Sequence, residues 1–178
     1  LRCTYCMPEE GFPVSPEDRL PSVDELMQIV SVFQEMGIDK IRLTGGEPLA
    51  NHNLPEILDR LAGMGFDDLN ITTNGILLDR YIDKFLEVGL RSVNVSLDTL
   101  DSDKYAEITR RNRFEKVMQN IARGMEAGLK IKINAVLLKH FSEEEIRPML
   151  EWSKSTPVHV RFIEFMPFDG NKWDADKL

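Results

Sequence analysis

Two cysteines near the start of the chain, Cys3 and Cys6, have the spacing that most directly suggests chemistry. A Cys-x-x-Cys pair serves thiol–disulfide exchange, half of a zinc site or part of an iron–sulfur site. An exchange motif opens a helix directly after a strand, whereas here Pro8 and a segment rich in proline and glycine follow. The position therefore argues against exchange and leaves both kinds of metal site open.

Zinc would need further ligands besides the two thiols. The chain offers three histidines on scattered segments, and each is more often a surface residue than a ligand: His52, His140 and His159. A non-catalytic zinc or dithiol module therefore stays as a different class of function, ranked below an iron–sulfur site.

Helical and strand patterns alternate along the rest of the chain. Segment 22–37 begins with Ser22 and Glu25 at capping-box spacing and ends at Gly37, and Ser142 and Glu145 repeat that spacing. Apolar periodicity predicts five strands, at 40–46, 69–75, 92–98, 130–138 and 158–166. It predicts helices at 22–37, 54–65, 80–89, 114–128 and 142–155.

Strands that alternate with helices of this length indicate βαβ units on a parallel sheet, either open and doubly wound or closed toward a barrel. Along one predicted strand, Val93 and Val95 alternate with Asn94 and Ser96, so one face is apolar and the other polar. Central strands of an open sheet are apolar on both faces. We therefore predict an α/β fold, a partial βα barrel, with the site at the carboxyl ends of the strands.

Composition limits the partners. The chain has 178 residues, 42% of them hydrophobic, and a net charge of -8, which favours one globular domain and argues against nucleic acid. No apolar run approaches the roughly 20 residues that span a bilayer. Two cysteines cannot build a secreted disulfide scaffold, so we expect a reducing compartment, a cytoplasm rather than a mitochondrial matrix. Because Leu1 is no initiator residue, we expect a longer gene product.

Several short stretches together resemble one family. "CTYC" followed by "MPEEG", then "RLTGGEP", "TTNG", "NVSLDTLD" and "VRFIEFMPFDGNKW" closely resemble the GTP 3',8-cyclases, radical S-adenosylmethionine (SAM) enzymes that begin molybdenum cofactor biosynthesis. The resemblance runs from end to end, so residues 1–178 are expected to form a radical SAM core domain, a partial (βα)6-type TIM barrel incomplete at the N-terminus. Radical SAM enzymes have a C-x-x-x-C-x-aromatic-C motif, and its first cysteine is expected just upstream of Leu1.

The resemblance implies a lyase that converts GTP to (8S)-3',8-cyclo-7,8-dihydroguanosine 5'-triphosphate. It implies a 4Fe–4S cluster that binds SAM at one iron, an electron donor, and a radical that takes hydrogen from the ribose without an acid or base catalyst. A homodimer is one assembly that it allows. The family also holds a second 4Fe–4S cluster in a C-terminal segment that this chain lacks, so the fragment alone is expected to be inactive.

The resemblance assigns roles to individual residues of this sequence. The resemblance implies that Cys3 and Cys6 bind the cluster and that SAM meets Tyr5, Gly46, Ser96 and Met166. It implies that GTP meets Arg42, Thr73 and Lys132.

The alternation of side chains along the strands supports two of these GTP contacts independently. Arg42 and Lys132 are cations on the polar face of their strands and need anionic partners. The alternative is an internal ion pair with Glu47, Asp98 or Glu164. The remaining basic cluster is expected at a solvated surface, with phosphate contact as the alternative: Arg110, Arg111 and Arg113.

The closest rival function keeps the radical chemistry and changes the substrate. A radical SAM enzyme that acts on a peptide or another small molecule would share the cysteine pair and the GGE stretch. Only the segment near residues 161–173 and the overall match favour GTP.

Overall fold

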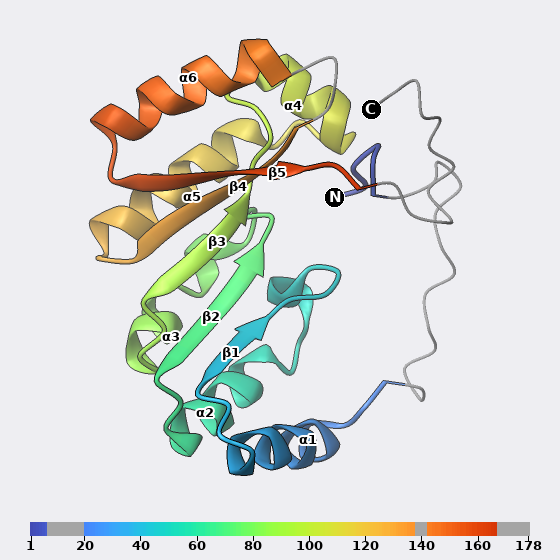
Figure 1. Ribbon diagram of the computed structural model, residues 1–178, viewed down its shortest axis with the longest axis vertical. Helices are drawn as coiled ribbons and strands as arrows, with labels where there is room; N and C mark the ends of the chain where they lie inside the picture. The colour runs from blue at the N-terminus through green and yellow to red at the C-terminus, as the bar shows by residue number, and fades with distance from the viewer. Residues whose placement is uncertain (7–19, 138–141, 167–178) are drawn as a thin grey trace.

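A computed structural model describes residues 1–6, 20–137 and 142–166 of the chain (Figure 1). Five strands form one sheet in which every neighbouring pair is parallel and the spatial order follows the chain. The strands are β1 (Lys40–Leu43), β2 (Asp68–Thr73), β3 (Ser92–Ser96), β4 (Lys130–Leu137) and β5 (Val158–Glu164). In a doubly wound sheet the order of the strands reverses at a switch point. Here each strand is added on the same side of the one before it, as in a βα barrel.

In the described part of the chain, six helices connect or flank the strands. They are α1 (Val23–Glu35), α2 (Leu54–Met64), α3 (Ile82–Glu87), α4 (Ser102–Thr109), α5 (Phe114–Glu126) and α6 (Ser142–Ser155), with short 3-10 turns η2 (Pro48–Ala50) and η3 (Leu78–Arg80). Five of the helices were predicted, and the capping box of Ser22 and Glu25 is confirmed. The cap predicted at Ser142 lies outside the described side chains. Helix α4 was not predicted.

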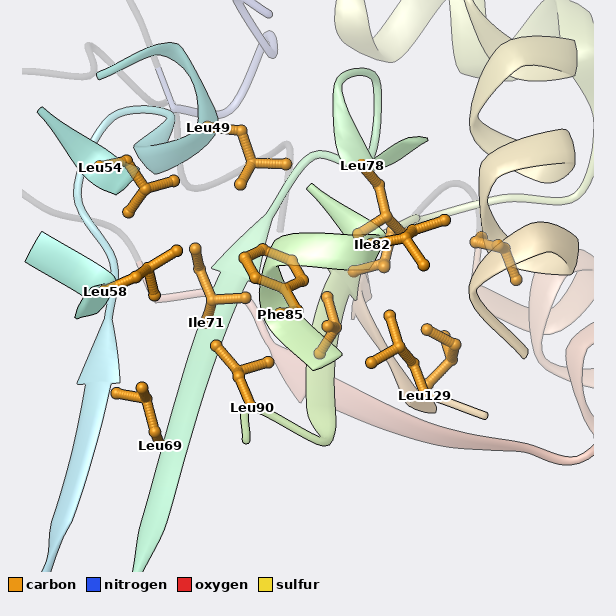
Figure 2. Close-up of a cluster of buried hydrophobic side chains, with 14 of the residues drawn as sticks. Leu49, Leu54, Leu58, Leu69, Ile71, Leu78, Ile82, Phe85, Leu90 and Leu129 are labelled. Atoms are coloured by element: carbon orange, nitrogen blue, oxygen red, sulfur yellow. The ribbon is translucent and has the colours of Figure 1, made fainter. Parts of the chain in front are cut away.

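The helix side of the sheet forms the apolar core. In-register residues of four neighbouring strands make an apolar row across the sheet: Leu43, Ile71, Val93 and Ile131. Figure 2 shows Leu58 of α2 and Phe85 of α3 packed around Ile71 of β2, and all three side chains are fully buried. The alternation of apolar residues along the strands therefore places one face of the sheet against the helices.

The other face of the sheet is polar, as parity predicted. Thr72, Asn94 and Lys132 are in register across β2, β3 and β4. Asn94 is fully buried; its amide donates to the Ile71 carbonyl oxygen at 3.2 Å, and its oxygen accepts from Arg161 of β5. The sheet curves in Figure 1, with α2, α3, α5 and α6 along its outer side, so this polar face lies on the inside of the curve. The prediction of a partial barrel is confirmed.

Candidate functional site

A pocket of about 430 Å³ lies at the carboxyl ends of β1, β2 and β3. Its wall combines the N-terminal loop with the residues that follow each of these strands, at 44–47, 72–74 and 96–99, and with one face of α4. The carboxyl ends of parallel strands meet at one edge of the sheet, which is where βα barrels place their active sites.

The cysteine loop closes one side of this pocket. The Cys6 amide donates to the Cys3 carbonyl oxygen at 3.0 Å, so the two cysteines flank a single tight turn. The Thr4 amide donates to the Ile108 carbonyl oxygen at 2.9 Å, and the Arg2 amide donates to that of Thr109 at 3.4 Å. The last carbonyls of a helix have no partner inside it, so the end of α4 is free to hold this loop.

Tyr5, between the cysteines, reaches across the pocket. Its hydroxyl donates to Asp98 Oδ2 at 2.8 Å, and its ring meets Phe165 edge-on with 6.3 Å between centroids. The other carboxylate oxygen of Asp98 accepts from the Val136 amide at 2.8 Å. Asp98 thus joins the cysteine loop to the ends of β3 and β4.

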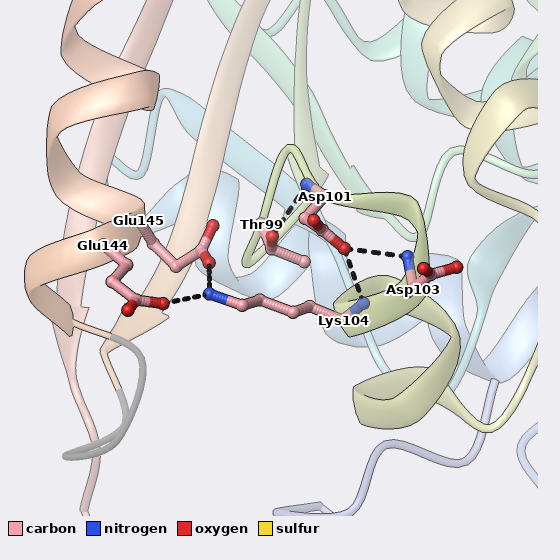
Figure 3. Close-up of polar contacts among 6 residues, drawn as sticks. All are labelled: Thr99, Asp101, Asp103, Lys104, Glu144 and Glu145. Atoms are coloured by element: carbon pink, nitrogen blue, oxygen red, sulfur yellow. Dashed lines mark hydrogen bonds and ion pairs between the residues drawn. The ribbon is translucent and has the colours of Figure 1, made fainter.

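Helix α4 is fixed at its other end as well (Figure 3). Asp101 caps it by accepting from the amides of Asp103 and Lys104, both at 2.9 Å. The Lys104 ammonium group pairs with Glu144 at 2.6 Å and with the buried Glu145 at 2.9 Å, which ties α4 to the first turn of α6. These hydrogen bonds raise the pKa of Lys104. The support of the cysteine loop therefore extends to α6.

The GGE turn forms the opposite wall. Glu47 accepts from the Thr73 hydroxyl at 2.6 Å and from the Asn74 amide at 2.8 Å, so it connects the loop after β1 with the end of β2. Gly45 has a φ of +143°, a backbone conformation that side chains disfavour. A Cβ added to Gly46 would meet no atom within 4 Å, so the glycine leaves open space beside the pocket.

Six of the nine predicted site residues line this pocket: Cys3, Tyr5, Cys6, Gly46, Thr73 and Ser96. Their predicted roles stay predictions. The Thr73 hydroxyl is engaged inside the protein, since it donates to Glu47 and accepts from the Gly75 amide at 3.1 Å.

The other three residues lie elsewhere. Arg42 is exposed on β1, Lys132 lines a second depression at the start of β4 and β5, and Met166 is 75% exposed just beyond β5. Within the described part of the chain, neither Arg42 nor Lys132 forms an ion pair. Their alternative, an internal pair with Glu47, Asp98 or Glu164, gains no support, because none of these carboxylates forms an ion pair with a described residue.

Burial controls the charge of the two thiols. It raises the pKa of Cys3 to about 12, and the neighbouring carboxylate of Asp98 adds to that shift. It also raises the pKa of Cys6, again with help from Asp98. Thiol–disulfide exchange needs a lowered pKa, so protonated thiols at neutral pH weigh against a dithiol redox module.

The same thiols fit a metal cluster. Metal binding displaces the thiol proton, so a high pKa in the free protein does not prevent ligation. The described residues contain no group of three or more histidine, cysteine, aspartate or glutamate side chains that could hold a metal by themselves. A zinc site built wholly from that part of the chain therefore gains no support, whereas Cys3 and Cys6 can supply two ligands of a cluster completed by other residues.

Sequence reasoning missed two parts of the site. Asp98 was considered only as an ion-pair partner, although its place on the polar face beside Ser96 was visible in the sequence. The role of α4 had no such signal, because its eight residues carry little apolar periodicity.

Comparison with protein families gives a match to the radical SAM superfamily over residues 1–153. Two curated relatives align with all of this chain. "Molybdenum cofactor biosynthesis protein 1" of Drosophila melanogaster is 42% identical, and the alignment covers 32% of its own length. "GTP 3',8-cyclase, mitochondrial" of Arabidopsis thaliana is 43% identical, and the alignment covers 46% of its own length. "GTP 3',8-cyclase" of Thermodesulfovibrio yellowstonii is 42% identical over 99% of this chain and 56% of its own length. The chain thus spans between a third and little more than half of these three relatives.

Solved structures agree on the fold. Streptococcus suis SuiB bound to S-adenosylmethionine superposes with a TM-score of 0.77 at 20% identity, over 98% of this chain and 38% of SuiB. The structure titled native anSMEcpe with bound AdoMet gives a TM-score of 0.68 at 17% identity, over 93% of this chain and 48% of that one.

In the part of the chain that the structure describes, none of the helices combines the length and the apolar composition that a membrane span requires.

Proposed function

This chain belongs to the radical SAM superfamily, and from that premise we propose that it is the core of a GTP 3',8-cyclase, which carries out the first step of molybdenum cofactor biosynthesis. The observation that best supports the proposal is the pocket whose wall brings together the Cys3–Cys6 turn, the GGE turn and the end of β3. The end-to-end identity of 42 to 43% with relatives named for this activity or this pathway favours GTP as the substrate.

In this proposal Cys3 and Cys6 provide two thiolates to a 4Fe–4S cluster, and the third comes from outside residues 1–178, since the chain has two cysteines. When bound, the cluster and SAM would supply the 5'-deoxyadenosyl radical that takes hydrogen from the substrate. Gly46 leaves room for the ligand beside the backbone, and Ser96 offers a hydroxyl at the wall of the pocket.

The remaining residues would bind the substrate and exclude water. Arg42 and Lys132 are cations that suit a triphosphate, and they lie outside the pocket of Cys3 and Cys6. Thr73 would contribute through its methyl group or a remaining lone pair, because its proton is held by Glu47. Met166, beyond the end of β5, would meet SAM once the ligand fills the pocket.

The domain organisation, the partners and the compartment belong to the same proposal. Residues 1–178 form one core domain, and a second 4Fe–4S cluster belongs to a segment after Leu178. An electron donor reduces the cluster, and a homodimer is one assembly that the family resemblance allows. The compartment is the bacterial cytoplasm, with the mitochondrial matrix as the alternative that the name of the Arabidopsis relative raises.

The test uses the full gene product that contains this chain, reconstituted with iron and sulfide under anaerobic conditions. Dithionite and SAM are added with and without GTP, and 5'-deoxyadenosine and guanine-derived products are quantified by mass spectrometry. GTP-dependent 5'-deoxyadenosine with a rearranged GTP product is the expected result. Formation of 5'-deoxyadenosine with unchanged GTP would overturn the substrate and favour a peptide or another small molecule.

Cysteine variants test the ligand assignment separately. Cys3→Ala and Cys6→Ala are each expected to abolish cluster assembly while the far-UV circular dichroism spectrum is retained, because neither thiol belongs to the main apolar cluster between the sheet and its helices. Thr4→Ala, between them, is the control that keeps both thiols. A cysteine variant with a full iron content would contradict the assignment.

A further inference from the structure

Asp98 is a partly buried carboxylate that the proposed chemistry does not use. It lies two residues past the end of β3, and burial raises its pKa, although the hydrogen bonds from Val136 and Tyr5 oppose that shift. It forms no ion pair with any residue that the structure describes. Burying a carboxylate without a cation is costly, so both of its oxygens need strong donors.

Those two donors come from segments far apart in the sequence. The Tyr5 hydroxyl approaches Oδ2 and the Val136 amide approaches Oδ1, each at 2.8 Å. With both oxygens occupied, Asp98 is poorly placed to take a proton from a ligand in the pocket. Its position suits a structural link between the cysteine loop and the ends of the strands.

Tyr5 is the only side chain between the cysteines that crosses to the strands through a described hydrogen bond. The backbone bonds of Thr4 and Arg2 to the end of α4 hold the loop at one side, and Tyr5 holds it at the other. A loop fixed at both sides cannot turn about the α4 contact. The direction of both thiols therefore depends on the hydrogen bond between Tyr5 and Asp98.

We propose that Asp98 is a positioning residue: through its hydrogen bond to Tyr5 it holds the Cys3–Cys6 turn in the orientation in which both thiols bind one cluster. The proposal rests on the proposed function, because it supposes that these thiols hold iron. Residues that orient metal ligands from behind typically change metal affinity by about 10- to 100-fold when removed.

The main variants are Tyr5→Phe and Asp98→Ala in the reconstituted full gene product. Each is expected to lose iron to a chelator about tenfold faster than the unmodified protein and to change the electron paramagnetic resonance signal of the reduced cluster. Asp98→Asn keeps an oxygen acceptor for one donor and is expected to be less affected than Asp98→Ala. In the double variant the losses are less than additive, because both single changes break the same bond.

Two control variants make the same kind of change at residues that do not take part in the hydrogen bond between Tyr5 and Asp98. Tyr81→Phe removes a hydroxyl from a tyrosine that stacks on Phe85 at 6.0 Å, away from the pocket. Asp101→Asn neutralises an exposed carboxylate and keeps a side chain that can cap α4. Both are expected to release iron at the rate of the unmodified protein. If Asp98→Ala fails to fold, Tyr5→Phe, which removes a single oxygen atom, carries the test.

A measurement on the iron-free protein separates this proposal from the proposed function. Tyr5→Phe is expected to make the alkylation of Cys3 by iodoacetamide severalfold faster, because the loop is released on one side. Iron release, spectrum and alkylation that all match the unmodified protein would overturn the positioning role. An unmodified protein that binds no iron would instead overturn the proposed function, and the alkylation rates would still test the link.

Discussion

The two faces of the sheet differ in how completely their side chains are satisfied. On the helix side, Leu58, Ile71 and Phe85 are fully buried in an apolar cluster that needs no polar partner. On the inner side, buried polar atoms remain without a hydrogen-bond partner within the described part of the chain: Asn70 Oδ1, Ser92 Oγ, Asn134 Oδ1 and Arg161 Nε. A buried polar atom without a partner costs about 1–3 kcal/mol.

The difference separates stability from function. The helix side gains free energy from burial and can be understood without any ligand. The inner side and the pocket at its carboxyl edge retain groups that burial disfavours, namely amides, the Cys3 thiol and the Asp98 carboxylate. Such groups are found where a ligand or cofactor supplies the missing interactions.

The largest expected effect is on the helix side. Phe85→Ala should lower the free energy of unfolding by about 3–5 kcal/mol, because a fully buried ring leaves a cavity. Urea unfolding followed by circular dichroism measures the loss. Phe33→Ala is the matched control on α1, where the ring is 48% exposed, and little change is expected there. Equal losses at both positions would contradict the location of the core.

The next largest effect is expected on the alkylation rate of the Cys3 thiol. With the pKa of Cys3 at about 12 rather than 9.0, its alkylation at pH 8 in the folded, iron-free protein should be up to about 1000-fold slower than in urea. The folded state binds the proton more tightly, so stability from Cys3 is complete below pH 9 and is lost as the pH rises toward 12. Equal alkylation rates in folded and unfolded protein would refute the burial of the thiol.

A polar substitution on the inner face should have a smaller effect. Asn94→Ala removes the acceptor of Arg161 and the donor to the Ile71 carbonyl, and should cost about 1–3 kcal/mol in urea unfolding. Asn134→Ala deletes an amide oxygen that has no partner among the described residues, so a smaller loss is expected. A larger loss at Asn134 would show that this oxygen is satisfied.

The smallest effect is expected at the support of α4. Glu144→Gln keeps the side-chain length and removes the pair of this exposed carboxylate with Lys104, while the buried Glu145 keeps its partner. We expect a modest fall in melting temperature at low salt that shrinks at high salt, because partly exposed ion pairs are screened. A fall that is independent of salt would indicate that packing, rather than charge, holds α4 to α6.

Much of the fold followed from local patterns. Helix α1 was visible from its capping box and its terminal glycine, and β3 from the alternation of Val93 and Val95 with Asn94 and Ser96. Parity also placed the polar face correctly. Helix α4 was missed because only a few of its residues are apolar, and tertiary contacts through Tyr105 and Ile108 stabilise it instead of propensity.

The candidate site was predicted less completely. The cysteine pair and the GGE stretch were recognisable as short motifs, and both lie at the pocket. The link from Tyr5 to Asp98 joins positions 93 residues apart, so no local pattern could indicate it. Arg42 and Lys132 lie on the polar face as predicted and yet outside the pocket of the cysteines. Lys132 lies toward the start of β4, whereas Arg42 is the third of the four residues of β1.

The sequence by itself determined the alternation of strands and helices, the apolar and polar faces of the sheet, and the residue types available for chemistry. These properties depend on the periodicity of neighbouring residues, which is local. Only the tertiary structure decided that the first turn of the chain rests on the end of α4 and is held by Asp98. Such contacts depend on strand register and helix placement, which are fixed when distant segments bury their apolar surfaces together.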